Sequence, residues 1–212
     1  MQSLSRCNKS LEDILNEIIV QKIAVGHINF KEHLDISAST LSTILYFLET
    51  RDLESFNLYF LRNFKFENEK LFKKVIPENI CKMLYCRIND QVFLKDLYIE
   101  NFGYIKIFAK PDAFFGDLPI EIKSISLKML NGGKYKFLER YGRYQAEMYG
   151  YILNKDTAYL IMIIYNNNLK IINYKVIKID LNLEKINKRV VDALKDVVLP
   201  MLKKIHFAAG GI

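Results

Sequence analysis

The sequence is poor in the features that mark several large classes of protein. It has only three cysteines and no C-x-x-C pair, which argues against a disulfide framework and against a four-thiolate zinc or iron-sulfur site. Gly and Pro are scarce and no repeat or low-complexity tract occurs, so a disordered or collagen-like chain is not expected. No apolar run approaches the roughly 18 residues of a membrane helix, and no apolar leader precedes the first charges. We therefore expect an intracellular (cytoplasmic) protein without a membrane partner.

Negative charge is scarce in the second half of the chain. Met1 to Ile122 carries 15 Lys and Arg against 17 Asp and Glu, whereas Lys123 to Ile212 carries 16 against 7. The net charge of +7 therefore comes from the last 90 residues. Such asymmetry favours a polyanionic partner, nucleic acid first, although a basic face can also serve solubility alone.

The N-terminal part has helical periodicity. Apolar residues recur at helical spacing from Leu11 to Ile19 after Ser10, a suitable N-cap. One or two more helices are expected between Ser39 and Phe64, and another from about Asn68 to Ile76, ending at Pro77. Residues 1–80 are thus predicted to be mainly helical.

Strand periodicity follows in the rest of the chain. The expected strands are Tyr104–Ala109, Leu118–Ile125, Thr157–Tyr165 and Leu169–Ile179, and the expected helices are Phe137–Leu153 and Leu183–Leu199, the last disturbed by Pro200. The first two strands are predicted to pair as a hairpin, with Gly116-Asp117 as a turn. Residues 81–212 are therefore expected to form an α/β core, within a single domain spanning residues 1–212.

Residues suited to phosphate chemistry gather between Lys110 and Ser124. Residues two apart in a strand face the same side, so Glu121 and Lys123 share one face. A hairpin turning at Gly116-Asp117 would carry Asp112 beside Glu121. The two carboxylates and the Ile122 carbonyl oxygen would suit Mg²⁺ or Mn²⁺, which prefer oxygen ligands.

A lysine beside such a site has a clear use. The ammonium of Lys123 can orient or help deprotonate an attacking water, and can offset charge on a phosphate. The set predicts phosphodiester hydrolysis. The pattern D-x-n-E-x-K is also frequent by chance, however, and a hairpin Asp or an edge-strand Glu/Lys pair is commonly only solvated.

These residues carry a family resemblance. Pro111-Asp112 followed by Glu121-Ile122-Lys123 resembles the signature of the PD-(D/E)XK nuclease superfamily. On the next helix, Gln145 to Tyr149 resembles the Q-x-x-x-Y motif of its RecB-type and CRISPR-associated exonuclease branch, and Gln145 and Tyr149 share a helix face from which both could reach the site or the DNA. The same pair would also suit a helix–sheet interface. In length and layout the chain is similar to small nucleases of archaeal spindle-shaped viruses, for which the location would be the host cytoplasm.

The resemblance implies a restriction-endonuclease-like core, a mixed central β-sheet flanked by helices behind a helical N-terminal region. It also implies a further acidic or His ligand from an upstream helix, with Glu69 as the candidate and Glu67 as the reserve, although either can be a solvated glutamate. The branch often holds an iron-sulfur cluster through late cysteines, but no cysteine follows Cys86, so no cluster is expected. The absence of a Walker A sequence likewise predicts no nucleotide cofactor.

A basic segment follows the expected catalytic strand. Lys128, Lys134, Lys136, Arg140 and Arg143 are candidate DNA-binding residues. The aromatics between them, Tyr135, Phe137, Tyr141 and Tyr144, are expected to stack on exposed bases. A solvated helix face would explain the charges as well.

The leading hypothesis is a Mg²⁺- or Mn²⁺-dependent deoxyribonuclease acting in DNA replication, recombination or repair, with Asp112, Glu121, Lys123, Gln145 and Tyr149 at the catalytic site. A DNA-binding protein of the same fold without cleavage is the alternative, and a module that binds acidic proteins is a third. The sequence leaves open whether the enzyme cuts ends, internal bonds or junctions. It also leaves the oligomeric state open, with a homodimer as one option.

Overall fold

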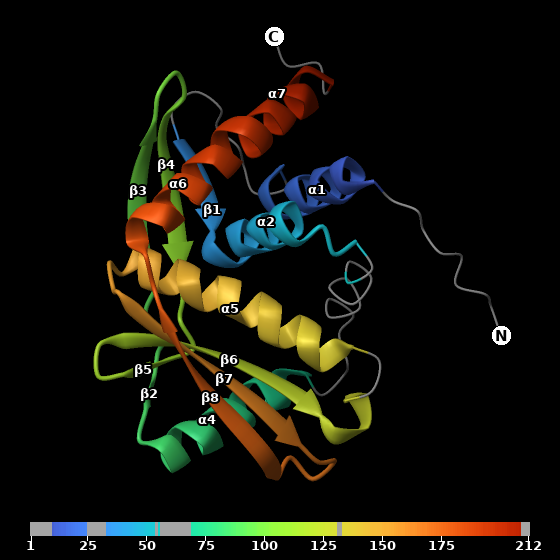
Figure 1. The fold of residues 1–212 in the computed structure, drawn as a ribbon, viewed down its shortest axis with the longest axis vertical. Coiled ribbons are helices and arrows are strands. Elements are labelled where there is room, and N and C mark those ends of the chain that lie inside the picture. The colour runs from blue at the N-terminus through green and yellow to red at the C-terminus, as the bar shows by residue number, and fades with distance from the viewer. Residues whose placement is uncertain (1–9, 25–32, 54, 56–68, 131–132, 209–212) are drawn as a thin grey trace, which may run out of the picture.

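The computed structural model describes residues 10–24, 33–53, 55, 69–130 and 133–208, without the side chains of residues 24, 33, 69–74 and 206–208. The expected α/β class is confirmed, with helices and strands packed around mixed sheets. Figure 1 shows α5 (Lys134–Ile152) crossing the middle of the molecule, between the strands of one sheet and the N-terminal helices. This helix contacts both layers and therefore organises the structure.

The sheet beside α5 has five strands in the order β2-β5-β6-β7-β8. They are β2 (Arg87–Ile88), β5 (Ala113–Phe115), β6 (Leu118–Ser126), β7 (Thr157–Tyr165) and β8 (Ile171–Asp180). β6 and β7 are parallel, and the other neighbours are antiparallel. Parallel neighbours need a crossover connection, which α5 provides after the short 3-10 turn η2 (Leu127–Met129).

Both faces of this sheet are covered. Leu160 and Met162 of β7 belong to the large core that includes α5, whereas Ile161 and Ile163 pack with Ile76 of α4 (Glu69–Leu84). The near-continuous apolar run predicted for this strand is what a strand buried on both faces requires, and its predicted bounds are confirmed.

A second sheet of three strands has the order β1-β4-β3. Its strands are β1 (His33–Ser37), β3 (Phe93–Ile99) and β4 (Gly103–Ala109). β4 pairs with β3 and, in parallel, with β1. The predicted hairpin between Tyr104–Ala109 and Leu118–Ile125 is therefore wrong. The partner of β6 is instead the three-residue strand β5, which is too short to show a periodicity of its own.

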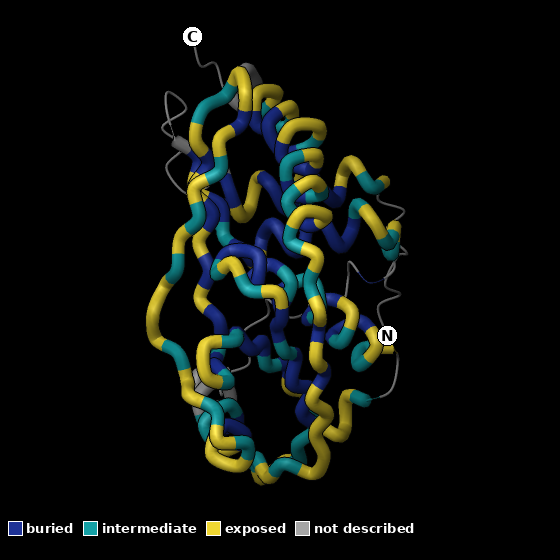
Figure 2. The backbone as a smooth tube through the Cα atoms, turned by 60° about the vertical axis from the view of Figure 1, so that its left-hand side comes forward, coloured by how far each residue is buried: buried dark blue, intermediate teal, exposed yellow. Residues whose placement is uncertain are grey.

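The N-terminal helices are α1 (Leu11–Ile19), extended by the π-helical turn η1 (Val20–Ala24), and α2 (Ala38–Thr50). The predicted N-cap is confirmed, because the Ser10 side chain accepts from the Asp13 N–H and Asp13 reciprocates in a capping box. Both helices bury their apolar faces in the large core. Figure 2 shows how the buried residues concentrate where helices and sheets meet. Most of the chain between α2 and α4 lies outside the described residues.

The helix end predicted at Pro77 is wrong, and the C-terminal helix is disturbed next to Pro200 as predicted but continues beyond its predicted end at Leu199. α4 continues through Pro77 to Leu84, since Ile76 and Ile80 on either side of it are fully buried, and packing offsets the lost backbone hydrogen bond. The C-terminal helix also continues, from α6 (Leu183–Ala193) through the π-helical turn η3 (Leu194–Val198) into α7 (Leu199–Ala208). This wider turn comes directly before Pro200, which has no N–H to donate.

None of the helices in the described part of the chain combines the length and the apolar character needed to cross a membrane.

Candidate active site

The β5–β6 hairpin places Asp112 opposite Glu121, as predicted. It turns at Gly116, whose φ of +60° lies in the left-handed region that glycine adopts without strain. Ala113 pairs with Ile120, and the Asp112 N–H donates to the Ile120 carbonyl at 3.1 Å. Just beyond this pairing, the Ile122 N–H donates to Asp112 Oδ2 at 2.7 Å. The backbone of β6 thus fixes the position of the Asp112 carboxylate.

Glu121 and Lys123 lie on the face of β6 that α5 covers. Both are buried, with 3% and 4% of their surfaces exposed. The Lys123 ammonium donates to Glu121 Oε1 and to Gln145 Oε1 of α5, and it lies 5.3 Å from the centre of the Tyr141 ring. Buried charges need such partners, so the alternative of a solvated strand pair is wrong for Glu121 and Lys123.

Tyr149 is the tyrosine of the Q-x-x-x-Y pattern, and it is also buried. Burial is the main cause that raises the pKa of its hydroxyl well above the ordinary value, and the charges of Glu121 and Asp112 raise it further. The Tyr149 hydroxyl is therefore a neutral group close to both carboxylates. The structure thus brings together Asp112, Glu121, Lys123, Gln145 and Tyr149.

The Asp112 carboxyl group lies in a strongly perturbing environment, mostly enclosed with some surface left exposed. Burial raises its pKa to about 8, and the nearby Glu121 charge acts in the same direction. The Lys123 charge and the hydrogen bond from Ile122 oppose the shift. Two carboxylates this close repel each other unless a proton or a cation lies between them.

The donor set fits a hard divalent cation. Glu121 Oε2 is buried and accepts no hydrogen bond from the described residues, which is unusual for a buried oxygen. The N–H and C=O of one strand residue point to the same side. The Ile122 carbonyl therefore points to the side where its N–H meets Asp112. Carboxylate and carbonyl oxygens are the ligands that Mg²⁺ and Mn²⁺ prefer.

A third acidic ligand is not among the described side chains, which contain no group of three His, Cys, Asp or Glu able to hold a metal. Glu69 is the first residue of α4, but its side chain is not described, and Glu67 lies outside the described residues. The upstream ligand therefore remains a prediction.

Gly142 also shapes the site, although no motif in the sequence marks it. A Cβ atom there would lie 2.7 Å from Leu160 Cδ1 and 3.1 Å from Lys123 Cγ, so glycine lets α5 approach the sheet closely. Its position in the sequence could have identified it, because Gly142 stands three residues before Gln145 and therefore near the same face of α5.

The predicted base-stacking role of two aromatics is wrong. Phe137 and Tyr141 are 3% and 4% exposed and pack against Tyr46 of α2, while the Tyr141 hydroxyl lies 3.0 Å from Thr43 Oγ1. Helical spacing puts Tyr141 on the face of Gln145 and Tyr149, which points into the core. Tyr135 and Tyr144 are half-buried and also pack against this core.

The predicted DNA-binding residues are spread over two elements. Lys128 is exposed in η2, ahead of α5, and Lys134 and Lys136 lie in the first turn of α5. Arg140 and Arg143 lie further along α5 and line a cavity between α2, α5 and α6. Arg143 is two residues from Gln145, so helical spacing places it on nearly the opposite face of α5.

The chain shares its fold with a phage-related exonuclease from Haemophilus somnus 129PT, with a TM-score of 0.53 and 15% sequence identity over 84% of this chain and 100% of that chain. It is also similar to an alkaline exonuclease from Laribacter hongkongensis, with a TM-score of 0.48 and 14% identity over 92% and 98% of the two chains. No protein-family model and no curated protein sequence matches the chain. The first likeness defines the fold as that of the exonuclease, and the activity must be argued from the site.

Proposed function

We propose that this protein is a Mg²⁺- or Mn²⁺-dependent deoxyribonuclease of the PD-(D/E)XK type. The observation that carries the proposal is Glu121 Oε2, a buried carboxylate oxygen without a hydrogen bond from the described residues, close to Asp112 and on the same carboxylate that accepts from Lys123. Structural ion pairs satisfy their oxygens, whereas a metal ligand leaves one oxygen facing the ion.

The reaction is the addition of water to a phosphodiester. The oxygen of water attacks phosphorus, the bond from phosphorus to the leaving sugar oxygen breaks, and that oxygen takes up a proton. A bound divalent cation would supply Lewis acidity and lower the pKa of water. Asp112, Glu121 and the Ile122 carbonyl would hold this ion.

Lys123 is placed to stabilise negative charge on the reacting phosphate. Because Glu121 and Gln145 both accept from its ammonium, the ammonium group is held in one position. A fixed positive charge in a dry site stabilises the charge that develops on the phosphate oxygens. Gln145 is thus a positioning residue, and Tyr149 supplies a neutral hydroxyl beside the carboxylates.

The proposal includes a role in DNA replication, recombination or repair and membership of the RecB-like branch with its Q-x-x-x-Y motif. The shared fold of the phage-related exonuclease makes DNA ends the first substrate to examine. Flaps, duplexes and four-way junctions complete the set, because the site itself acts on a single phosphodiester.

The test is cleavage of end-labelled DNA of each form in Mg²⁺, Mn²⁺ or EDTA. We expect the wild type to cut in either metal and not in EDTA, and Glu121→Gln to be inactive. Asp117→Asn is the matched control, since Asp117 is an exposed carboxylate of the same hairpin paired with Lys155. Cleavage that survives EDTA or Glu121→Gln would contradict the proposal. Binding of DNA without cleavage in any metal would favour the non-catalytic DNA-binding alternative.

A further inference from the structure

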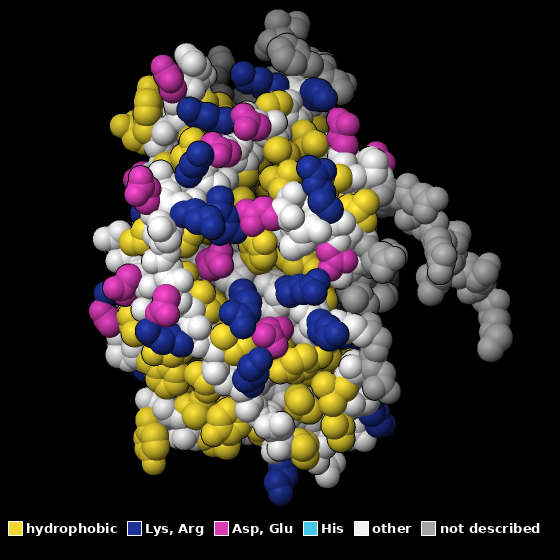
Figure 3. Space-filling view, in the orientation of Figure 1, with side chains coloured by type: hydrophobic (Ala, Val, Ile, Leu, Met, Phe, Trp, Pro, Cys, Tyr) yellow, Lys and Arg dark blue, Asp and Glu magenta, His cyan; other side chains and the backbone are white. Residues whose placement is uncertain are grey.

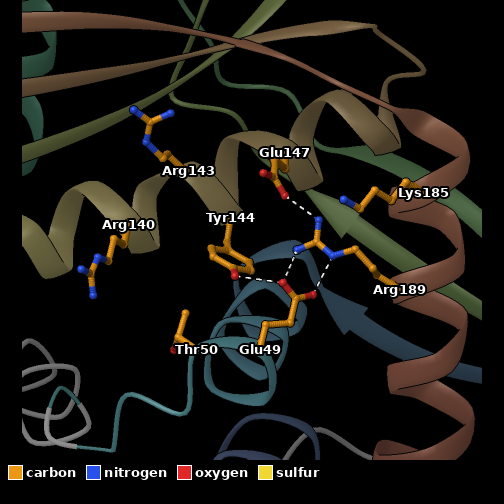
Figure 4. A pocket seen from close by; sticks show the side chains of 8 residues that line it. All are labelled: Glu49, Thr50, Arg140, Arg143, Tyr144, Glu147, Lys185 and Arg189. Atoms are coloured by element: carbon orange, nitrogen blue, oxygen red, sulfur yellow. Dashed lines mark hydrogen bonds and ion pairs between the residues drawn. The ribbon is translucent and has the colours of Figure 1, made fainter.

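A second charged site lies on the opposite side of α5. A cavity of about 580 Å³ opens between α2, α5 and α6 and is lined by Glu49, Thr50, Arg140, Arg143, Tyr144, Glu147, Lys185 and Arg189. Figure 4 shows side chains from all three helices around it. Four of these residues are cationic and two are anionic, so the site carries a net positive charge.

The acidic residues in the cavity are already engaged by one arginine. Arg189 contacts Glu49 at 2.6 Å and Glu147 at 3.0 Å, and the Tyr144 hydroxyl donates to Glu49 at 2.9 Å. Arg189 is only 21% exposed in its side chain. This network joins α6 to α2 and α5.

The remaining cations, Arg140, Arg143 and Lys185, lie at the edge of the cavity and are more exposed than Arg189. The Arg140 side chain is 61% exposed and lies at the 4.0 Å limit from Asp52. Arg143 pairs with Glu139 at 3.2 Å but is 41% exposed, and a pair of that exposure exchanges easily with another anion. Lys185 is exposed on α6. Figure 3 shows Lys and Arg side chains gathered across the middle of this face.

We infer that this cavity is a remote anchor for the phosphate backbone of a nucleic acid, with Arg140, Arg143 and Lys185 as the contacts. The inference rests on the proposed nuclease function and specifies where its substrate is held. Arg143 and Gln145 belong to one helix but face opposite ways, one into the cavity and one onto Lys123. The anchor is therefore separated from the reacting bond by a helix diameter of about 10 Å.

That separation has a measurable consequence. At a rise of about 3.4 Å per nucleotide, a strand must extend at least about three nucleotides beyond the reacting bond to reach the anchor. Short oligonucleotides should thus gain nothing from the cavity. Long ones should gain affinity, because phosphate contacts position the backbone without reading sequence, while the rate of the bound complex stays the same.

The decisive variant is Arg143→Ala/Lys185→Ala, and the matched control with the same loss of charge is Lys106→Ala/Lys204→Ala, on β4 and α7. Binding is measured by fluorescence anisotropy in Ca²⁺ with single strands of about 4 to about 30 nucleotides, a range that brackets one binding site. For the long strand we expect affinity to fall about 10- to 30-fold near 0.1 M salt. The log–log salt slope should become shallower by about 1.4 units.

The outcomes separate this inference from the proposed function. If affinity rises with strand length in the wild type and in the control but not in the decisive variant, the anchor is supported, whether or not the DNA is cut. If the protein cleaves DNA but the decisive variant has the salt slope and the length dependence of the wild type, the anchor is overturned and the proposed nuclease function is not affected. Displacement of long DNA by inorganic phosphate at constant ionic strength, seen in wild type but not in the decisive variant, would assign the cavity to a free phosphate ion and overturn it as well. In steady-state cleavage of the long strand, we expect the decisive variant to have a higher KM than the wild type and the same kcat.

Discussion

The backbone N–H of Ile122 donates to the carboxylate of Asp112 at 2.7 Å. Ile122 therefore holds the Asp112 carboxylate in place, and its own carbonyl oxygen is a second candidate ligand for the metal. The side chain of Asp112 is therefore positioned before any ion binds. Pre-positioned ligands lose little freedom on binding, and the two carboxylates repel each other until a cation or a proton arrives.

This repulsion predicts an opposite effect of substitution on stability and on metal binding. In EDTA at about pH 9, above the Asp112 pKa of about 8, Asp112→Asn should melt at or above the wild-type temperature, because it removes a buried charge next to Glu121. Mg²⁺ at ten times its Kd should stabilise the wild type by about 1.4 kcal/mol, or roughly 3 to 6 °C, and should not stabilise the variant. Differential scanning calorimetry measures both, with Asp117→Asn as the control. A Mg²⁺ shift retained in Asp112→Asn would remove Asp112 from the metal site.

Lys123 should be needed for the chemical step. We expect Lys123→Ala to cut at least about 100-fold more slowly, the effect of losing one electrostatic or acid–base group. Lys123→Arg should not restore the rate, since a guanidinium is planar and bulkier than an ammonium and the site is closed by Leu160 and Gly142. Single-turnover rates with saturating enzyme provide the measurement. Lys178→Ala, an exposed lysine on β8, should cut normally, and equal rates for Lys123→Ala would make Lys123 a structural residue.

Gln145 should act through Lys123. Gln145→Leu removes one of the two acceptors of the ammonium and should lower kcat by about 10- to 100-fold, the usual effect of losing a group that orients a functional residue. A helix-packing role alone would lower the melting temperature without changing kcat in the folded protein. Gln145→Glu keeps an acceptor and should retain more activity than Gln145→Leu.

Gly142→Ala should destabilise the protein although alanine favours helix. The gain in helix propensity is about 1 kcal/mol. The new methyl group, however, would lie 2.7 Å from Leu160 Cδ1 and 3.1 Å from Lys123 Cγ, and overpacking of this kind costs about 1 to 3 kcal/mol. Chemical denaturation gives the free energy of unfolding. A variant as stable as wild type would show that α5 can move away from the sheet, and its cleavage rate would then report whether Lys123 tolerates the shift.

The parts of the site that the sequence predicted are those encoded by local spacing. The turn at Gly116 fixes the register that sets Asp112 opposite Glu121, and the spacing of Gln145 and Tyr149 fixes a helix face. The partners of β4 could not be predicted in the same way. β1 is short and lies far away in the sequence, so its pairing depends on packing that no local periodicity records.

The burial of Phe137 and Tyr141 was also not predicted from the sequence. Tyr141 and Arg140 are neighbours in the sequence, yet one lies in the core and the other is exposed. Composition placed both in one basic and aromatic segment. Only the helical phase set by Gln145 separates them, because residues four apart share a face and adjacent ones do not.

The parallel pairing of β1 with β4 also constrains the order in which the protein forms. Leu34 pairs with Ile105, so β1 leaves the ribosome well before its neighbour exists, and at about 5 to 20 residues per second the wait lasts several seconds. β6, α5, β7 and β8 are consecutive in the sequence and can assemble through short loops, which favours fast folding. We therefore expect amide protection in a hydrogen-exchange pulse experiment to arise first in β6 to β8 and last in β1, with the catalytic half formed before the N-terminal strand docks.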